Sequence, residues 1–473
     1  MQMKNYKFEI FTQAIEKNIK SGVYKPGQKL PSVRDFKDYY GLSMSTVQAG
    51  YEYLMIRGLV ESVPKSGYYV SAKNEMLAEP GGHGRPPIVR DAVFEQRLGL
   101  TTASPLGRGF SEFNVAAPGD LLVPQKLLLR TMQQVIRELG AGLLRYYPSN
   151  GSVQLKDNIV SRAASHQTLL HTDELLITDG ALQALYIALA AVCEAGDIVA
   201  VESPCVFSVL EVIRVLKLRV IEVPVLTKEG FDIDFFRRAC QRSAVKAVVL
   251  TPNFHNPTGI LLADEQKIAL LAIAHQYHVA VIENDIYGDL NFHGSRPSTL
   301  KQFDESGLVM TYSSYSKTLA PGIRLGWLST GLFLKDAEQI KFALGSTVSP
   351  LNQETVSRLI GSSSYDRHIR SLKMQLAKNA YLATNLIASS FPEQTKVIAP
   401  AGGYSLWVKM PESTDMSDFY AQCEKIGARF TPGYTFSFAN TFGHYFRLVI
   451  ADKFSDKRIE AIQHIGRYLC GNL

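Results

Sequence analysis

The sequence contains few cysteines, little excess charge of either sign and no long apolar run. Its five cysteines lack the close spacing of metal ligands and do not form a disulfide framework. The longest apolar stretch, residues 181–193, is too short to cross a bilayer and is expected to be a buried helix. The N-terminus lacks the apolar core of a signal peptide. These absences predict a soluble cytoplasmic protein with reduced thiols, no membrane contact and no metal site.

The chain is long enough for two or three domains, and part of its small charge excess lies at one end. At 473 residues it exceeds the usual size of a single domain. The net charge of +6 does not by itself argue for nucleic acid. Residues 1–75, however, carry 11 Lys and Arg against 7 Asp and Glu. This local excess slightly favours a nucleic-acid-binding unit at the N-terminus.

The first 75 residues, hereafter the head, have the element order of a winged helix-turn-helix. Ser32 and Asp35 have capping-box spacing at the start of a second helix, and Ser43 can cap a third. Two short strand patterns joined by a turn follow and would form the wing. The expected elements are helices over residues 4–20, 33–40 and 44–57 and strands over 59–63 and 68–71.

Residues 76–111 are predicted to be a linker, and residues 112–473, hereafter the body, a single large domain. The glycine- and proline-rich run 79–87 cannot form a core. In the body, apolar strand patterns alternate with helical ones, which predicts an α/β fold with a mostly parallel sheet covered on both faces. The expected strands are 174–178, 198–202, 246–250, 279–283 and 308–312.

The run from Ser313 to Gly326, SSYSKTLAPGIRLG, is the most informative stretch of the chain. It places Lys317 among hydroxyl groups, with Arg324 seven positions further on and an expected strand just before it. Such a lysine can form an imine with an aldehyde, and the hydroxyls and the arginine can hold a phosphate. Pyridoxal phosphate has both groups.

Other residues that this cofactor needs also follow expected strands, where α/β sheets bind ligands. Asp285 and Tyr287 follow the strand 279–283, and Asn256 follows the strand 246–250. Gly180 and Ala181 begin a helix whose free N–H groups can face a phosphate. Each residue alone has an ordinary explanation, such as a surface lysine, a turn or a helix cap. Their order along one sheet predicts a cofactor site.

Here the body resembles the fold-type I aminotransferases, through Asn-Pro-Thr-Gly, Asp-x-Tyr and Ser-x-Ser-Lys followed by Gly-x-Arg-x-Gly. The resemblance implies a large pyridoxal-phosphate-binding domain with a smaller C-terminal α+β subdomain. The implied roles are Lys317 as the Schiff-base lysine, Asp285 at the pyridinium nitrogen, Asn256 and Tyr287 at the phenolate oxygen, and Ser314, Arg324 and the Gly180 and Ala181 amides at the phosphate.

The same resemblance implies a homodimer and a carboxylate-binding arginine. Tyr146 matches the tyrosine that the partner subunit contributes to the phosphate site, and Arg447 matches the arginine that grips a substrate carboxylate. One departure concerns the aromatic residue that usually covers the pyridine ring. Val206 stands where it is expected, so either Phe207 or an aliphatic side chain would cover the ring.

The head resembles the GntR family of winged-helix regulators, in which the third helix enters the major groove and the wing touches the DNA backbone. The implied DNA contacts are Arg34, Ser45, Thr46, Gln48, Lys65, Ser66 and Gly67. The head departs from the family at Met44, where an arginine is usual, and at Gly50, where alanine is usual. Glycine at that position is expected to cost the helix ~1 kcal/mol.

A GntR-like head joined to an aminotransferase-like body resembles the MocR group of transcriptional regulators. The resemblance implies a dimer that binds double-stranded DNA and senses pyridoxal phosphate, or an amine or amino acid that condenses with it. Three alternatives stay open: a working aminotransferase with an accessory head, a sensor of pyridoxal phosphate alone, and a winged helix that serves dimerisation. Residual transaminase activity is compatible with an aminotransferase-like domain that is used for sensing.

Overall fold

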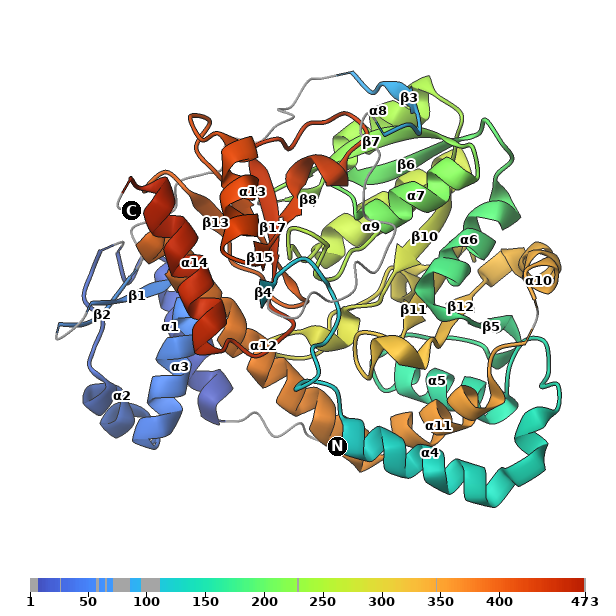
Figure 1. Cartoon of the computed structure of the whole chain (residues 1–473), viewed down its shortest axis with the longest axis horizontal. Coiled ribbons are helices and arrows are strands. Elements are labelled where there is room, and N and C mark those ends of the chain that lie inside the picture. The colour runs from blue at the N-terminus through green and yellow to red at the C-terminus, as the bar shows by residue number, and fades with distance from the viewer. Residues whose placement is uncertain are drawn as a thin grey trace.

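The structure is a computed structural model that describes residues 7–25, 27–56, 59–63, 66–70, 86–94, 111–227, 229–345 and 347–471 (Figure 1). The head lies beside the C-terminal part of the body, and the large sheet lies on the far side of that part (Figure 1). No helix in these ranges has the length and apolar content needed to cross a membrane.

The predicted order of elements in the head is confirmed. Ser32 and Asp35 form the expected capping box, in which the Asp35 carboxylate accepts from the Ser32 N–H at 2.8 Å. Gly41, with φ 61°, ends that helix in the left-handed region that favours glycine. The elements are α1 Lys7–Lys20, α2 Val33–Tyr40, α3 Met44–Ile56, β1 Val60–Val63 and β2 Gly67–Val70, the last two antiparallel.

Aromatic rings build the core of the head. Tyr51 of α3 stacks on Tyr68 of the wing with 3.9 Å between ring centroids. Phe11 of α1 meets Phe36 of α2 edge to face at 5.1 Å. These contacts, together with buried aliphatic residues such as Ile15, Val47 and Leu54, tie the three helices and the wing into one small unit.

Within the described residues, nine strands form the main sheet of the body, in the order β3-β7-β6-β9-β10-β11-β12-β5 with β8 paired to β7. The run from β7 to β11 is parallel, while β12 and β3 are antiparallel to their neighbours. The strands are β3 Val89–Asp91, β5 Leu175–Thr178, β6 Ile198–Ser203, β7 Arg219–Leu226, β8 Gly230–Phe231, β9 Val245–Leu250, β10 Ala280–Asn284, β11 Val309–Ser314 and β12 Gly326–Ser329.

The five predicted strands are confirmed to within two residues at each end, as β5, β6, β9, β10 and β11. Four strands of this sheet were not predicted from the sequence: β3, β7, β8 and β12. β3 lies inside the stretch predicted to be a linker and pairs with β7 at the edge of the sheet. The sheet is therefore mixed but mostly parallel, in agreement with the predicted fold class.

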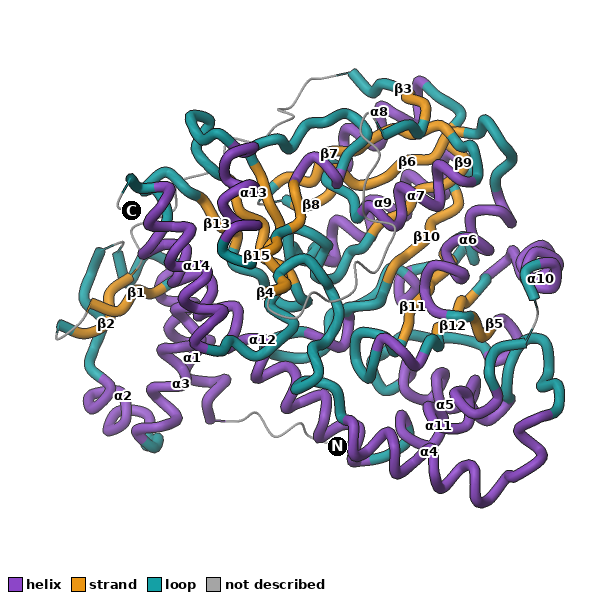
Figure 2. Tube along the Cα trace, viewed as in Figure 1, coloured by secondary structure: helices purple, strands orange, loops and turns teal. Residues whose placement is uncertain are grey.

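Helices cover both faces of this sheet (Figure 2). Side chains of α6, α7 and α10 pack on one face, and those of α8 and α9 on the other. The helices of this part are α4 Gln125–Leu139, α5 Val153–Ala164, α6 Gly180–Val192, α7 Phe207–Val215, α8 Ile233–Arg242, α9 Asp264–Tyr277, α10 Leu334–Ala343 and α11 Pro350–Ile360.

The long helix α12, Ser363–Ser390, leads into the smaller C-terminal subdomain. That subdomain has a sheet in the order β13-β14-β17-β16, and β15 pairs with β4 from the start of the body. Its elements, with the short strand that joins them, are β4 Ser111–Glu112, β13 Lys396–Ile398, β14 Ser405–Lys409, α13 Met416–Lys425, β15 Ala428–Arg429, β16 Thr431–Pro432, β17 Tyr445–Val449 and α14 Asp456–Leu469.

Packing explains the glycine at position 50 of α3. A Cβ there would lie 2.3 Å from Cε1 of Phe11, whose side chain is fully buried. Overpacking of a core typically costs about 1–3 kcal/mol, whereas alanine would gain the helix only about 1 kcal/mol. The cost of overpacking against Phe11 thus outweighs the gain in helix propensity that alanine would bring at position 50.

We therefore predict that Gly50→Ala destabilises the head. Hydrogen–deuterium exchange of the intact chain should be faster in α1 and α3 than in the unmodified protein and unchanged in the main sheet. Ala49→Gly, at the exposed neighbouring position, is the matched control and should show only the propensity cost of about 1 kcal/mol. Slower exchange in Gly50→Ala would contradict the packing argument.

Candidate functional site

The carboxyl ends of β9, β10 and β11 bring the predicted cofactor residues to one edge of the sheet. The three strands are parallel neighbours, so the segments that follow them emerge side by side. Asn256 follows β9, Asp285 directly follows β10, and Lys317 lies three residues beyond β11. The structure therefore brings together residues that are 61 positions apart in the sequence, from Asn256 to Lys317.

Lys317 lies in an enclosed position and lacks an acidic partner. Its Nζ donates to the backbone carbonyl of Ala116 at 2.6 Å, and no carboxylate of the described residues lies within ion-pair distance of it. Burial, together with the positive charges of Arg447 and Arg324, lowers the pKa of Lys317 to about 8. An amine with that pKa is partly neutral near physiological pH and can act as a nucleophile.

Arg447, Asn256 and Tyr287 form a buried hydrogen-bonded chain. Arg447 of β17 is 1% exposed and donates to the Asn256 side-chain oxygen at 3.0 Å. The Asn256 amide in turn donates to the Tyr287 hydroxyl at 3.2 Å. Arg447 also donates to the carbonyl of Asn114 and to the hydroxyl of Thr431. The arginine is thus held by neutral oxygens.

Two further features leave Arg447 able to take an anion. Its Nε is buried without a hydrogen-bond partner, as is the side-chain oxygen of Asn114 nearby. Burial lowers the pKa of Arg447 to about 10, which still leaves it charged at neutral pH. No carboxylate in the described part of the chain pairs with it. A carboxylate ligand would supply the missing negative charge.

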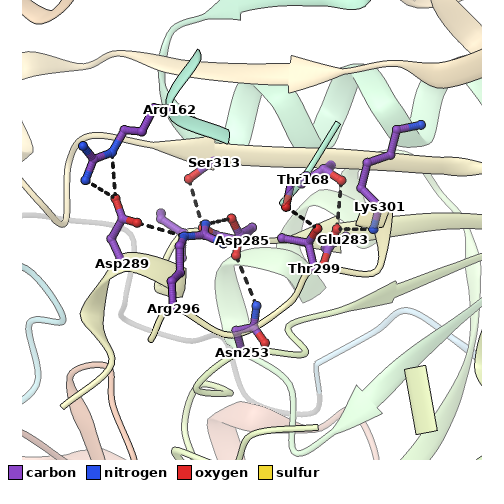
Figure 3. A network of polar contacts seen from close by, with 12 residues as sticks. Arg162, Thr168, Asn253, Glu283, Asp285, Asp289, Arg296, Thr299, Lys301 and Ser313 are labelled. Atoms are coloured by element: carbon purple, nitrogen blue, oxygen red, sulfur yellow. Dashed lines mark hydrogen bonds and ion pairs between the residues drawn. The ribbon is translucent and has the colours of Figure 1, made fainter. Parts of the chain in front are cut away.

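Asp285 belongs to a buried network of alternating charges (Figure 3). Arg296 forms ion pairs with Asp285 and, through Nε at 2.9 Å, with Asp289. Arg162 of α5 approaches Asp289 from the other side at 3.4 Å. Asn253 donates to Asp285 at 3.4 Å. Asp285 therefore has a cationic partner within the fold, unlike a carboxylate that faces only solvent.

The charges of this network set the ionisation of its two aspartates. Burial raises the pKa of Asp285, and the guanidinium of Arg296 opposes that rise. Although burial alone would raise it, the guanidinium groups of Arg296 and Arg162 lower the pKa of Asp289 to about 2. Arg296 is thus the group that favours the charged form of Asp285, the form a pyridinium nitrogen would need.

The candidate phosphate site lies where α6 begins. Gly180 has φ +74° and starts α6, and a Cβ on it would lie 2.9 Å from a terminal nitrogen of Arg324. Arg324 is half exposed and pairs with Asp179 at 3.3 Å. A Cβ on Gly326 would meet the backbone of Gly180 at 2.7 Å. The two glycines therefore let the Arg324 segment pack directly on the start of α6.

The remaining predicted residues of the body lie as follows. The Ser314 hydroxyl donates to the Leu325 carbonyl at 3.0 Å, inside the turn that carries Lys317. Ala181 follows Gly180 in the first turn of α6. Phe207 begins α7 and packs edge to face on Phe436, with the Arg447 guanidinium 5.8 Å from its ring. Tyr146 is 95% exposed, so within one chain its ring touches little.

In the head, the predicted DNA contacts lie on α2, on α3 and in the wing. Arg34 of α2 and Gln48 of α3 are exposed. The hydroxyls of Ser45 and Thr46 contact the Ser43 hydroxyl at 2.9 and 2.7 Å, so they also hold the start of α3. In the wing, Ser66 contacts the Tyr69 hydroxyl at 2.6 Å, Gly67 opens β2 with φ 120°, and Lys65 lies outside the described residues.

Sequence reasoning missed several residues of the site. Arg296 and Asp289 are charged residues within twelve positions of Asp285, which is a weak signal for a network. The Tyr404 hydroxyl donates to the Lys317 carbonyl. Tyr404 follows two glycines that pack against Phe254, and this Gly-Gly pair is its only signal in the sequence. Asn114 gives no signal of its own, because its backbone reaches Arg447 across more than 300 residues.

Two family models match different parts of the chain. Residues 117–465 match the family model for aminotransferase class I and II, and residues 11–70 match that for bacterial regulatory proteins of the gntR family. The chain is similar to the kynurenine aminotransferase of Pyrococcus horikoshii, with TM-score 0.72, 23% identity and coverage of 77% of this chain and 92% of that one.

Several regulators are similar over nearly the whole length. The HTH-type transcriptional regulators YjiR and YdcR of Escherichia coli K12 are 30% and 31% identical, covering 97% and 98% of this chain and 98% and 99% of their own. NorG of Staphylococcus aureus, also named an HTH-type transcriptional regulator, is 26% identical over 86% of this chain and 92% of its own.

The body is thus a class I and II aminotransferase domain with the fold-type I architecture. Because a GntR-family head precedes it and the full-length relatives are regulators of the same build, the chain belongs to the MocR-type transcriptional regulators.

The lowered pKa of Lys317 predicts a reactive amine. With a pKa of about 8, roughly a quarter of its amine is neutral at pH 7.5, against about one part in a thousand for an ordinary lysine. Trace acetylation with acetic anhydride between pH 6 and 10, read by mass spectrometry, should give a rate at Lys317 that rises with pH with a midpoint near pH 8. A midpoint in the range of ordinary surface lysines, about 10.4, would contradict the lowered pKa of Lys317.

Proposed function

We propose that this protein is a transcriptional regulator that binds DNA through its head and binds pyridoxal phosphate through Lys317. The observation that carries the proposal is an enclosed lysine without an acidic partner among the described residues, in an aminotransferase domain that follows a GntR head. A free-standing enzyme has no use for such a head. The MocR-type relatives, all named as regulators, support the same conclusion.

The residues present fit the cofactor group by group. Lys317 offers an amine to the aldehyde, and Asp285, which pairs with Arg296, suits the pyridinium nitrogen. Asn256 and Tyr287 offer donors to the phenolate oxygen. The N–H groups at the start of α6, Arg324 and Ser314 suit the phosphate. When bound, pyridoxal phosphate supplies an aldehyde that condenses with amines and a ring that withdraws electrons.

An amino compound with a carboxylate is the effector class that the site favours. Arg447 is buried, is charged at neutral pH and has no carboxylate partner among the described residues. A ligand carboxylate would satisfy it, whereas a simple amine would not. Arg447 would then bind the carboxylate of an amino acid, while the amine of the amino acid would meet the cofactor aldehyde that Lys317 holds.

We propose further that the protein acts as a homodimer. Tyr146, in the segment between α4 and α5, is 95% exposed, and the neighbouring Leu144 is 89% exposed. Leu129 and Ile136, on the outer side of α4, are also exposed. Large apolar side chains gathered on one side of a soluble protein indicate a surface covered by another chain. Tyr146 would reach the phosphate site of the partner from there.

The central test uses the purified full-length protein, pyridoxal phosphate and a DNA duplex from the region upstream of its own gene. Addition of the cofactor should give a visible absorbance that is absent in Lys317→Ala, and the unmodified protein should retard the duplex in a gel. Loss of Arg34, as Arg34→Ala, should weaken DNA binding without altering the absorbance. A colourless protein would refute the cofactor proposal. Rapid turnover of amino donors without any DNA shift would favour the enzyme alternative.

The role of Arg447 is tested by comparing an amino acid series with the corresponding amines. In the unmodified protein, amino acids should change the cofactor absorbance at lower concentrations than their amines. In Arg447→Gln this preference should fall about 10- to 100-fold, the worth of a hydrogen bond to a charged group. Arg458→Gln removes a buried arginine of the same subdomain that already pairs with Asp452 at 3.5 Å, and it should keep the preference. An unchanged preference in Arg447→Gln would exclude it as the carboxylate site.

A further inference from the structure

The recognition helix α3 is attached to the body at its C-terminal end. The ring of Tyr53 meets the ring of His293 edge to face, with 4.2 Å between centroids. The Tyr381 hydroxyl of α12 donates to the sulfur of Met55 at 3.6 Å. Ser45 and Gln48, near the other end of α3, are exposed. The body thus holds the helix without covering the residues expected to read DNA.

His293 lies at the tip of a loop that starts at the cofactor site. This loop, residues 285–296 and hereafter the site loop, begins with Asp285 and ends with Arg296. The ion pairs of Arg296 with Asp285 and Asp289 close its base (Figure 3). The proposed pyridinium partner and the contact with the head are therefore eight residues apart on one short, closed segment.

Hydrogen bonds stiffen the site loop between its base and its tip. Asn291 donates to the carbonyls of His293 and Gly294 at 3.0 and 2.8 Å, which fixes the shape of the tip. The Phe292 N–H donates to the Ala401 carbonyl at 3.0 Å, just before the glycines that lead to Tyr404. A segment held in this way moves as a unit, so a shift at its base is passed to its tip.

Helix α12 supports the same connection from behind. Lys373 donates to the Asn291 side-chain oxygen at 2.7 Å, and Tyr381 bonds to Met55 of the head. Eight residues along a helix span about 12 Å, so one rigid element touches both the site loop and α3. Figure 1 shows α3 alongside α12. The head is therefore seated against the two elements that adjoin the cofactor site.

The charges at the base of the site loop make it responsive to an occupant. Arg296 is shared between Asp285 and Asp289. A cation brought against Asp285 would compete with Arg296 for that carboxylate, because both rely on the same negative charge. Arg296 is also the residue that closes the loop. A change in its pairing would thus alter the base of the loop whose tip touches Tyr53.

We propose that the site loop couples occupancy of the cofactor site to the orientation of the recognition helix, through His293 and Tyr53. The coupling acts at the body-facing end of α3 and leaves the DNA-reading end free. It rests on the proposed function, because it needs a ligand that contacts Asp285. As for any such coupling, the ligand shifts the head only if it binds the two arrangements with different affinity.

The first experiment measures DNA affinity with and without pyridoxal phosphate, using the full-length protein and its own upstream duplex. In the unmodified protein the cofactor should change the affinity at least about fivefold, the lower range of typical allosteric coupling. In His293→Ala the absorbance of bound cofactor and the affinity without cofactor should stay within about twofold of the unmodified protein. The cofactor effect on DNA binding should disappear.

The matched control is His171→Ala, an exposed histidine at the turn before β5. It should keep the full effect of the cofactor on DNA affinity. A cofactor effect that survives in His293→Ala, or a full-length protein that binds cofactor and DNA without any mutual effect, would overturn the proposal.

A second measurement needs no cofactor and tests directly whether the base of the site loop is coupled to α3. In Arg296→Gln, which breaks the base of the site loop, hydrogen–deuterium exchange should rise at least about fivefold in residues 50–56 of α3, although the ion pairs of Arg296 lie within the loop. Arg358→Gln breaks a different ion pair of the body, with Glu138 at 2.6 Å, and should leave α3 unchanged. Unchanged exchange in Arg296→Gln, or an equal rise in both variants, would refute the connection. Absence of cofactor absorbance would instead refute the proposed function.

Discussion

The site depends on an imbalance of charge at one edge of the sheet. Its aspartates are paired with arginines of the fold, but Lys317 and Arg447 have no carboxylate partner among the described residues. An enclosed cation held only by neutral oxygens costs several kcal/mol unless a counter-charge is supplied. A fold that keeps two such groups close together is prepared for an anionic ligand that also reacts with an amine. The surrounding helices and strands serve mainly to maintain that arrangement.

Parallel strands explain why so much of this site could be predicted from the sequence. Lys317, Asp285 and Asn256 each follow a strand with a clear apolar pattern, and parallel neighbours deliver such residues to the same edge. Three of the missed strands, β3, β8 and β12, are only two to four residues long, which is too short for a clear pattern. β12 is a four-residue antiparallel strand directly after the Arg324 turn. β7 contains Pro224, which normally argues against a strand, but here it lies near the end of the pairing with β6.

Residues that act through tertiary contacts were beyond the sequence. Arg296 matters because the loop brings its guanidinium back into contact with Asp285, eleven residues earlier in the chain. A single sequence does not reveal that contact. Asn114 and Ala116 contribute backbone carbonyls, which carry no residue-specific signal. Gly50 was misinterpreted for a related reason. From the sequence it is only a residue that weakens a helix, whereas the structure shows that the ring of Phe11 occupies the space a larger side chain would need. The head was predicted in outline because its caps and turns are local features.

Regulation and catalysis would make different use of the same groups. Catalysis would need Lys317 to react in every turnover, whereas a sensor needs only that the ligand favour one arrangement of the protein. That preference must reach the DNA-reading helix through contacts that already exist in the folded chain. The segment from Asp285 to His293 meets this requirement with eight residues and one aromatic contact. Because Arg296 both pairs with Asp285 and closes that segment, the proposed coupling would pass through one residue that belongs to the site and to the loop in contact with the head.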